Sequence, residues 1–202
     1  MTEEIDDVVG RVLRASTRGY TCGTHSIRID ARHDFGAFVK VPIANDQDIF
    51  IVGLIYSVEI KDDLLINELV MAEAVDVNIL RDQRENRMIP VEISVLNVGY
   101  GRDNFFVHSL PPRPPMSLSQ VRLCSSEEVY YFTQQRDFFR LVLNASEVPS
   151  DDLAAAMIRY AADAYHPNER YEFLVTAGQY ITRMISSDTR RLSAILSLIR
   201  PG

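Results

Sequence analysis

The sequence lacks any long run of apolar residues. A helix that crosses a bilayer needs about 20 consecutive apolar residues, and no segment of the 202-residue chain approaches this length, although 47% of its residues are hydrophobic. The opening MTEEIDDVVG is acidic, whereas a secretory signal begins with basic residues and continues with an apolar stretch. We therefore expect a cytoplasmic protein without a membrane segment, large enough to bury one core or two small ones.

Cysteine is also scarce. The two cysteines, Cys22 and Cys124, are too few for a disulfide framework. We expect two reduced thiols that act as small apolar side chains, with a single bridge between them as the alternative.

The motifs that mark common enzyme classes are absent. The chain has no Gly-x-Ser-x-Gly, no Gly-x-x-x-x-Gly-Lys-Ser/Thr and no Gly-x-Gly-x-x-Gly. The carboxylate pairs Glu127/Glu128 and Asp151/Asp152 stand where helices are expected to begin, and a helix dipole favours acidic residues there without any catalytic role. We expect no catalytic residues and no cofactor, and an unrecognised enzyme is the weakest hypothesis.

Residues of metal-binding type occur near one another but with unsuitable spacing. Cys22 and His25 are three apart, so on a strand they point to opposite faces. Asp30, His33 and Asp34 fall in an expected loop, where such residues are usually solvated. We therefore expect no metal site.

Basic residues are outnumbered, which limits the possible partners. The formal net charge is −7, and the first 110 residues carry 11 basic and 18 acidic side chains, while the remainder carries 10 of each. A phosphate backbone requires clustered Lys and Arg, so the first part is not expected to bind nucleic acid. The local basic cluster Arg183, Arg190 and Arg191 is a candidate contact for an anion or an acidic partner, and a solvated helix face is the alternative.

What the sequence does contain is two regimes of periodicity, which predict an α+β fold. From residue 7 to about 107 the apolar residues alternate with period two, in short segments separated by turn residues. This pattern predicts a small N-terminal antiparallel β-barrel of about six strands over residues 1–110. Residues 62–89 have mixed periodicity and are expected to form an excursion from the barrel.

The segment 48–60 is the most informative expected strand. One face, assigned to the barrel interior, carries Phe50, Val52, Leu54, Tyr56, Val58 and Ile60. The other face carries Ile49, Ile51 and Ile55, which we therefore place outside the barrel as a candidate interface. We expect the helical bundle, a second copy of the chain or a partner to cover it. Gly53 is the expected site of a bend or bulge.

The prolines separate the two regimes. Residues 111–115 hold four prolines in five positions, a composition typical of a semi-rigid, polyproline-like spacer. We interpret residues 111–116 as a linker. The apolar residues of 117–202 recur at intervals of three and four, which predicts a C-terminal α-helical bundle with short connections.

Several segments also carry a family resemblance. In chain order they are VVGRVLRASTRGYTC, FGAFVKVPIANDQDIFIVGLIYSVEI, RDQRENRMIPVEISVLNVGY, LPPRPPMSL, FFRLVLNAS and SDDLAAAMIRYAADAY. The chain resembles, over nearly its whole length, the stand-alone bacterial proteins built on the HerA/ATP-synthase barrel (HAS-barrel). RDQRENR together with VEISVLNVGY favours the stand-alone group over a fragment of an ATPase.

The resemblance implies a six-stranded barrel like the one at the start of HerA-like DNA translocases and rotary ATP-synthase subunits. In those proteins the barrel assembles a ring and docks partners, while the nucleotide site lies in a separate motor domain. Our leading hypothesis is therefore a non-catalytic adaptor that contacts a protein partner, such as a HerA-like ATPase, or a second copy of itself. The alternative is a nucleic-acid-binding accessory protein that uses the C-terminal arginines.

Overall fold

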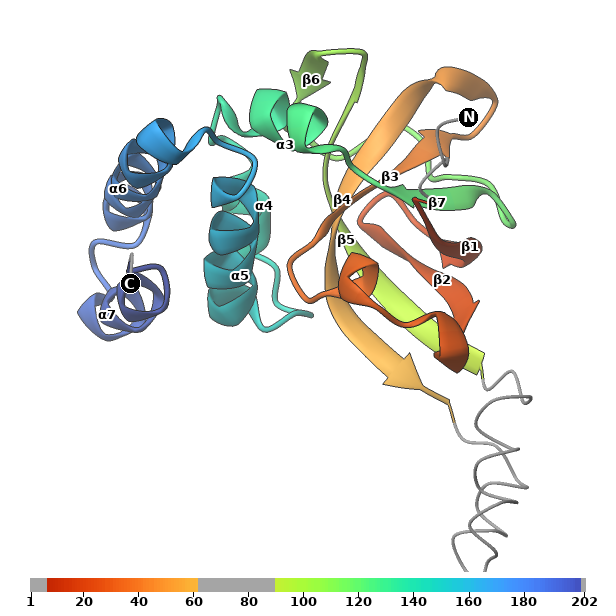
Figure 1. Ribbon diagram of the computed structural model, residues 1–202, viewed down its shortest axis with the longest axis horizontal. Helices are drawn as coiled ribbons and strands as arrows, with labels where there is room; N and C mark the ends of the chain where they lie inside the picture. Colours follow the sequence, from red (N-terminus) through yellow and green to blue (C-terminus); the bar gives the residue numbers. More distant parts are fainter. Residues whose placement is uncertain (1–6, 62–89, 201–202) are drawn as a thin grey trace, which may run out of the picture.

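A closed antiparallel β-barrel followed by α-helices forms the fold, and the class is α+β (Figure 1). The computed structural model describes residues 7–61 and 90–200. The excursion predicted for 62–89 lies outside the described residues. The strands of the barrel are β1 (Val8–Ala15), β2 (Gly19–His25), β3 (Phe38–Ile43), β4 (Asp46–Ile60), β5 (Pro90–Arg102) and β7 (Gln120–Leu123).

Closure of the barrel follows from the pairing of its strands. The order around the barrel is β1, β2, β5, β4, β3 and β7, and β7 pairs with β1 to complete the ring. All of these pairs are antiparallel. A short strand, β6 (Phe105–Val107), extends the sheet at the far end of β5. The predicted small antiparallel barrel of about six strands is confirmed.

The proline segment does not separate the barrel from the helices. It connects β6 to β7, so it joins two strands of one sheet, and Pro111 and Pro115 are buried. The carbonyl oxygen of Pro114 accepts a hydrogen bond of 3.1 Å from the backbone N–H of Ala44 in the β3–β4 turn. The interpretation of 111–116 as an interdomain linker is therefore wrong, and residues 117–202 include a strand of the barrel. The break in periodicity at the prolines therefore marks the connection between two strands of the barrel and not a domain boundary.

The two faces of β4 are the reverse of the prediction. Ile51 and Ile55 are fully buried among interior residues from the other barrel strands, and Ile49 packs against the same cluster. Val52 and Leu54, predicted to lie inside, belong instead to the cluster that the helices share. Both faces of this strand are apolar because both are covered, so alternation alone could not distinguish the inside from the outside.

Two bulges interrupt the pairing of β4 with β5. Val98 of β5 and Tyr56 of β4 each lack a register partner. The second bulge shifts the alternation by one residue, which places Val58 against the interior cluster, on the side that the sequence predicted. Gly53 adjoins the first bulge, and a Cβ at this position would collide with Cγ1 of Val95. The space beside Gly53 is already filled by the Val95 side chain and the carbonyl oxygen of Leu96, which explains the glycine.

Five α-helices follow the barrel within the described residues. They are α3 (Ser126–Thr133), α4 (Phe139–Leu143), α5 (Ser150–Ala162), α6 (Pro167–Met184) and α7 (Thr189–Leu198). Ser125 caps α3, because its hydroxyl accepts from the N–H of Glu128 while the Glu128 carboxylate accepts from the N–H of Ser125. The stretch 125–146 forms two helices, α3 and α4, separated by a turn. No helix in the described ranges combines the length and the apolar character needed to cross a membrane.

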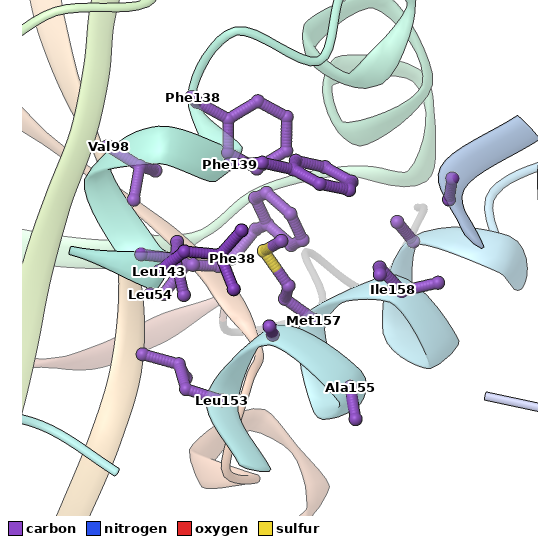
Figure 2. Packing of buried hydrophobic residues seen from close by; sticks show 14 of the residues in the cluster. Phe38, Leu54, Val98, Phe138, Phe139, Leu143, Leu153, Ala155, Met157 and Ile158 are labelled. Atoms are coloured by element: carbon purple, nitrogen blue, oxygen red, sulfur yellow. The ribbon is translucent and has the colours of Figure 1, made fainter. Parts of the chain in front are cut away.

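The helices share a hydrophobic core with the outer face of the barrel, and a second core fills the barrel interior. In Figure 1, α4 and α5 lie between the barrel and the outer pair α6 and α7. Figure 2 shows Phe38, Leu54 and Val98 of the barrel facing side chains of α4 and α5. We call this contact the barrel–helix interface; its helical side includes Phe138, Phe139, Leu143, Leu153 and Met157. The helices are thus built onto the outer face of the barrel.

Candidate functional site

The predicted interface on β4 is not an open surface. Ile51 and Ile55 have no exposed area, and the half-buried Ile49 also packs toward the barrel interior. A side chain that fills the barrel cannot contact a partner without unfolding it. The candidate interface Ile49, Ile51 and Ile55 is therefore wrong, and exposed apolar residues must be sought elsewhere.

Arg191, one of the three predicted anion-contact residues, has a structural role. Its Nε donates to the carboxylate of Asp151. Its guanidinium also donates to the hydroxyl of Ser150 at 2.8 Å and to the carbonyl oxygen of Leu143 at 2.9 Å. These bonds connect α7 to the C-terminal end of α4 and the first turn of α5. Arg191 has few donors left for a partner.

Arg183 and Arg190 are exposed, as a contact residue should be. Arg183 lies in the last turn of α6 and Arg190 lies near the start of α7. Within residues 7–61 and 90–200 the structure gives neither side chain an ion pair. They remain available for contact, but without the third member of the predicted cluster.

A groove that no local sequence pattern predicts lies among α5, α6 and α7. Its volume is about 610 Å³. We call it the arginine groove; it is lined by Arg159, Ala162, Pro167, Arg170, Tyr171, Leu174, Leu198, Ile199 and Arg200. Leu174 and Ile199 are buried at its floor, while Tyr171 is 65% exposed and Leu198 is 44% exposed. The groove therefore joins a buried apolar floor to open apolar walls.

Helical spacing explains how the groove forms. Pro167, Arg170, Tyr171 and Leu174 recur at intervals of three and four, so they occupy one face of α6. On the same helix Gly178 lies against α7, and a Cβ there would lie 3.3 Å from Cδ2 of Leu196. The missing side chain lets α7 approach α6 closely, which fixes one wall of the groove. The spacing was visible in the sequence, but only the packing shows that this face stays open.

The electrostatics of the groove are positive. Arg170 pairs with Asp163 at 2.7 Å, and both side chains are exposed, so the pair is weak. Arg159 and Arg200 are exposed and have no ion-pair partner in the described part of the chain. No described residue that lines the groove is acidic. An anionic group entering it would meet the unpaired guanidinium groups of Arg159 and Arg200, and that of Arg170 beside Asp163, above an apolar floor.

A second cleft, of about 600 Å³, lies where the β1–β2 turn meets the loop after α4. Arg18 of the turn and Glu147 of the loop, which both line it, form an ion pair of 2.9 Å. Because this pair joins the barrel to the helical layer and largely neutralises itself, the cleft presents less unpaired charge than the arginine groove.

The cysteines are poorly suited to nucleophilic chemistry. Burial raises the pKa of the Cys22 thiol to about 12, and burial also raises the pKa of Cys124 well above its usual range. Both thiols are free and stay protonated at neutral pH. The predicted pair of reduced, buried cysteines is confirmed.

The histidine and aspartates considered as metal ligands have local roles. His33 is buried, with Nε2 3.1 Å from the carbonyl oxygen of Val9, and its Nδ1 accepts from the N–H of Asp30. The Arg32 guanidinium donates to both oxygens of Asp30 and holds the pKa of that carboxyl well below its usual range. Across the described ranges, no three His, Cys, Asp or Glu residues are grouped so as to hold a metal ion.

No protein-family model matches this chain, and no curated protein matches it.

Proposed function

We propose that the protein is a non-catalytic adaptor or assembly module that acts in the cytoplasm through contact with another protein. The arginine groove carries this proposal, because it leaves large apolar side chains, Tyr171 and Leu198, open to solvent beside three cationic groups. Aromatic residues and arginine are the residue types enriched at protein interfaces. The buried, protonated cysteines support a role without nucleophilic catalysis.

We further propose that the barrel is of the HAS type and that the partner is an assembly such as a HerA-like DNA-translocating ATPase. The closed six-stranded antiparallel barrel at the start of the chain supports this proposal. In such a role the barrel and the inner helices form a rigid scaffold, and the outer helices α6 and α7 present the contact surface. Self-association of the chain is the competing form of the same adaptor role.

The alternative function, a nucleic-acid-binding accessory, relies on Arg183, Arg190 and Arg191. It has less support, because Arg191 is bonded to Asp151, Ser150 and Leu143. Two exposed arginines in a chain of net charge −7 are a small basis for binding a phosphate backbone.

Affinity capture from the native host, with the full chain as bait, tests the adaptor function. The lysate is treated with nuclease, and the captured proteins are quantified at moderate and high salt. We expect a protein partner in near-stoichiometric amount that survives nuclease treatment. Recovery that disappears with the nucleic acid and falls steeply with salt would favour the accessory function instead.

A further inference from the structure

The arginine groove combines two properties that together define what can fill it. The first is an apolar floor and wall, formed by Leu174, Ile199, Tyr171 and Leu198. Covering these side chains removes apolar surface from water, so the groove favours an occupant with a large apolar side chain. A ligand that offers only main-chain groups or charged side chains would leave these apolar side chains exposed to water.

The second property is the charge at the rim. Arg159 of α5, Arg170 of α6 and Arg200, which follows α7, come from three different elements and line one groove. Guanidinium groups bind carboxylates through two parallel hydrogen bonds, which gives the contact both energy and orientation. The rim therefore favours carboxylates placed on either side of the apolar anchor.

We infer that the arginine groove binds a short acidic segment of a partner protein, in which a large apolar side chain is flanked by Asp or Glu. This inference rests on the proposed adaptor function and names the chemistry of its partner. The apolar anchor lies on Leu174 and Ile199, where it covers Tyr171 and Leu198, and the flanking carboxylates pair with Arg159 and Arg200.

Two other occupants fit the groove less well. In a symmetric pair of identical chains the same patch faces itself, so the three arginines of one copy would meet those of the other. A nucleic acid would supply anions, but its bases stack on aromatic side chains, whereas aliphatic side chains form the floor of the groove. Charge complementarity therefore favours the acidic peptide over a second copy, and the aliphatic floor favours it over a nucleic acid.

The test is a direct binding measurement with the full chain and defined probes. The probe is a fluorescein-labelled peptide in which leucines alternate with pairs of glutamates, and binding is followed by fluorescence anisotropy. A matched peptide carries Gln in place of every Glu, and a short oligothymidylate represents nucleic acid. We expect the Glu peptide to bind at least about tenfold more tightly than the Gln peptide, because the guanidinium groups then have carboxylates to pair with.

The chain supplies a matched pair of variants. Arg159→Glu with Arg200→Glu reverses two charges of the groove, while Arg183→Glu with Arg190→Glu makes the same change in net charge at exposed positions of α6 and α7 outside it. We expect the groove variant to weaken binding of the Glu peptide by at least about tenfold and the control variant to change it by less than about twofold. Arg159→Gln with Arg200→Gln replaces the groove variant if reversal impairs folding.

Three results would overturn the inference. Equal weakening by both double variants would mean that binding follows net charge and not the groove. Tighter binding of oligothymidylate than of the Glu peptide would identify a nucleic-acid site. Concentration-dependent dimerisation that groove substitutions abolish, measured by sedimentation, would identify a second copy as the occupant.

Capture from the host separates this inference from the proposed function. If a protein partner is captured equally by the wild type and by the groove variant, the groove inference fails and the adaptor function stands. If the wild type captures no protein partner, the adaptor function itself fails.

Discussion

The helical layer has two apolar surfaces that differ in how they are completed. At the barrel–helix interface, α4 and α5 pack against β3, β4 and β5, and side chains such as Phe38, Leu54 and Met157 have no exposed area. At the arginine groove, α5, α6 and α7 enclose a floor of the same chemical type, but Tyr171 and Leu198 stay open to water. The chain covers the barrel–helix interface with its own side chains, whereas it leaves part of the arginine groove exposed to solvent.

The arginines beside these two surfaces also differ in whether they have partners within the chain. The arginine beside the inner helices, Arg191, is bonded to three groups of its own chain. At the groove, Arg159 and Arg200 have no ion-pair partner among residues 7–61 and 90–200. The difference teaches that the first surface contributes to folding, while the second is suited to binding. Substitutions on the two surfaces should therefore separate stability from association.

The largest effect is expected at the barrel–helix interface. Leu54→Lys places an unpaired charge among buried apolar side chains, so it should lower the free energy of unfolding by more than about 4 kcal/mol and abolish the native fold. Urea denaturation followed by circular dichroism measures this. Ile60→Lys on the same strand, where the side chain is 67% exposed, should change the free energy by less than about 0.5 kcal/mol. An equal loss of unfolding free energy in both variants would contradict the claim that Leu54 lies on a covered face and Ile60 at an exposed end of β4.

A smaller loss is expected when the bonds of Arg191 are removed. Arg191→Met keeps much of the side-chain length but leaves Asp151 and the carbonyl of Leu143 without this donor, so the unfolding free energy should fall by about 1 to 3 kcal/mol. Arg190→Met, at an exposed neighbour without such bonds, should change it by less than about 0.5 kcal/mol. A loss of the same size in Arg190→Met would show that Arg191 is an ordinary surface residue.

The pH dependence of stability tests His108, which packs on the barrel–helix interface. Its ring lies 4.6 Å from that of Phe132 and 5.1 Å from that of Phe138, and its Nε2 lies 3.0 Å from the carbonyl oxygen of Phe132. Burial lowers the pKa of His108, so in the window between the lowered value and the ordinary value near 6.5 the unfolded chain binds more protons than the folded one. Stability should therefore rise with pH through this window and level off above about pH 6.5.

The variant His108→Gln isolates this contribution. It removes the titrating group, so the difference in unfolding free energy between pH 8 and pH 5 should be smaller in the variant than in the wild type. Urea denaturation at the two pH values measures it. An unchanged difference would mean that other groups account for the pH dependence.

The smallest effect on stability is expected at the arginine groove. Leu198→Ala removes a side chain that is nearly half exposed, so the unfolding free energy should fall by less than about 1 kcal/mol. The same variant should bind the glutamate–leucine peptide several-fold more weakly, because part of the wall that covers the anchor is lost. A large loss of stability would show that the groove is a structural surface like the barrel–helix interface.

The barrel was predictable because its short alternating segments and turns leave few other arrangements. The helices beyond residue 125 were predictable because their apolar residues recur at intervals of three and four. What could not be read was which face of β4 is inside, since Ile51 and Leu54 are equally apolar and both are buried. The bulge at Tyr56 then shifts the alternation within one strand, a change that no local pattern announces.

The interpretation of the proline segment and the choice of site residues failed for a related reason. Both features depend on contacts between residues far apart in the sequence. A proline-rich run is compatible with a spacer or with a connection along a barrel end, and only the pairing of β7 with β1 decides between them. Arg159, Arg170 and Arg200 are far apart in sequence and come together only when α5, α6 and α7 pack. Local clustering pointed instead to Arg191, which the fold uses internally.

Site-specific photocrosslinking tests most directly whether the open surface is the docking surface. A photoreactive phenylalanine derivative replaces Leu198 in the groove or, as the control, Leu118 in the loop before β7, which is 68% exposed. After irradiation in the native host, the crosslinked peptide is sequenced. We predict that position 198 yields a peptide from a different protein, rich in Asp and Glu around an apolar residue, and that position 118 does not. Equal capture of that protein at position 118, or a peptide from a second copy of this chain at position 198, would contradict the assignment of the groove to an acidic partner.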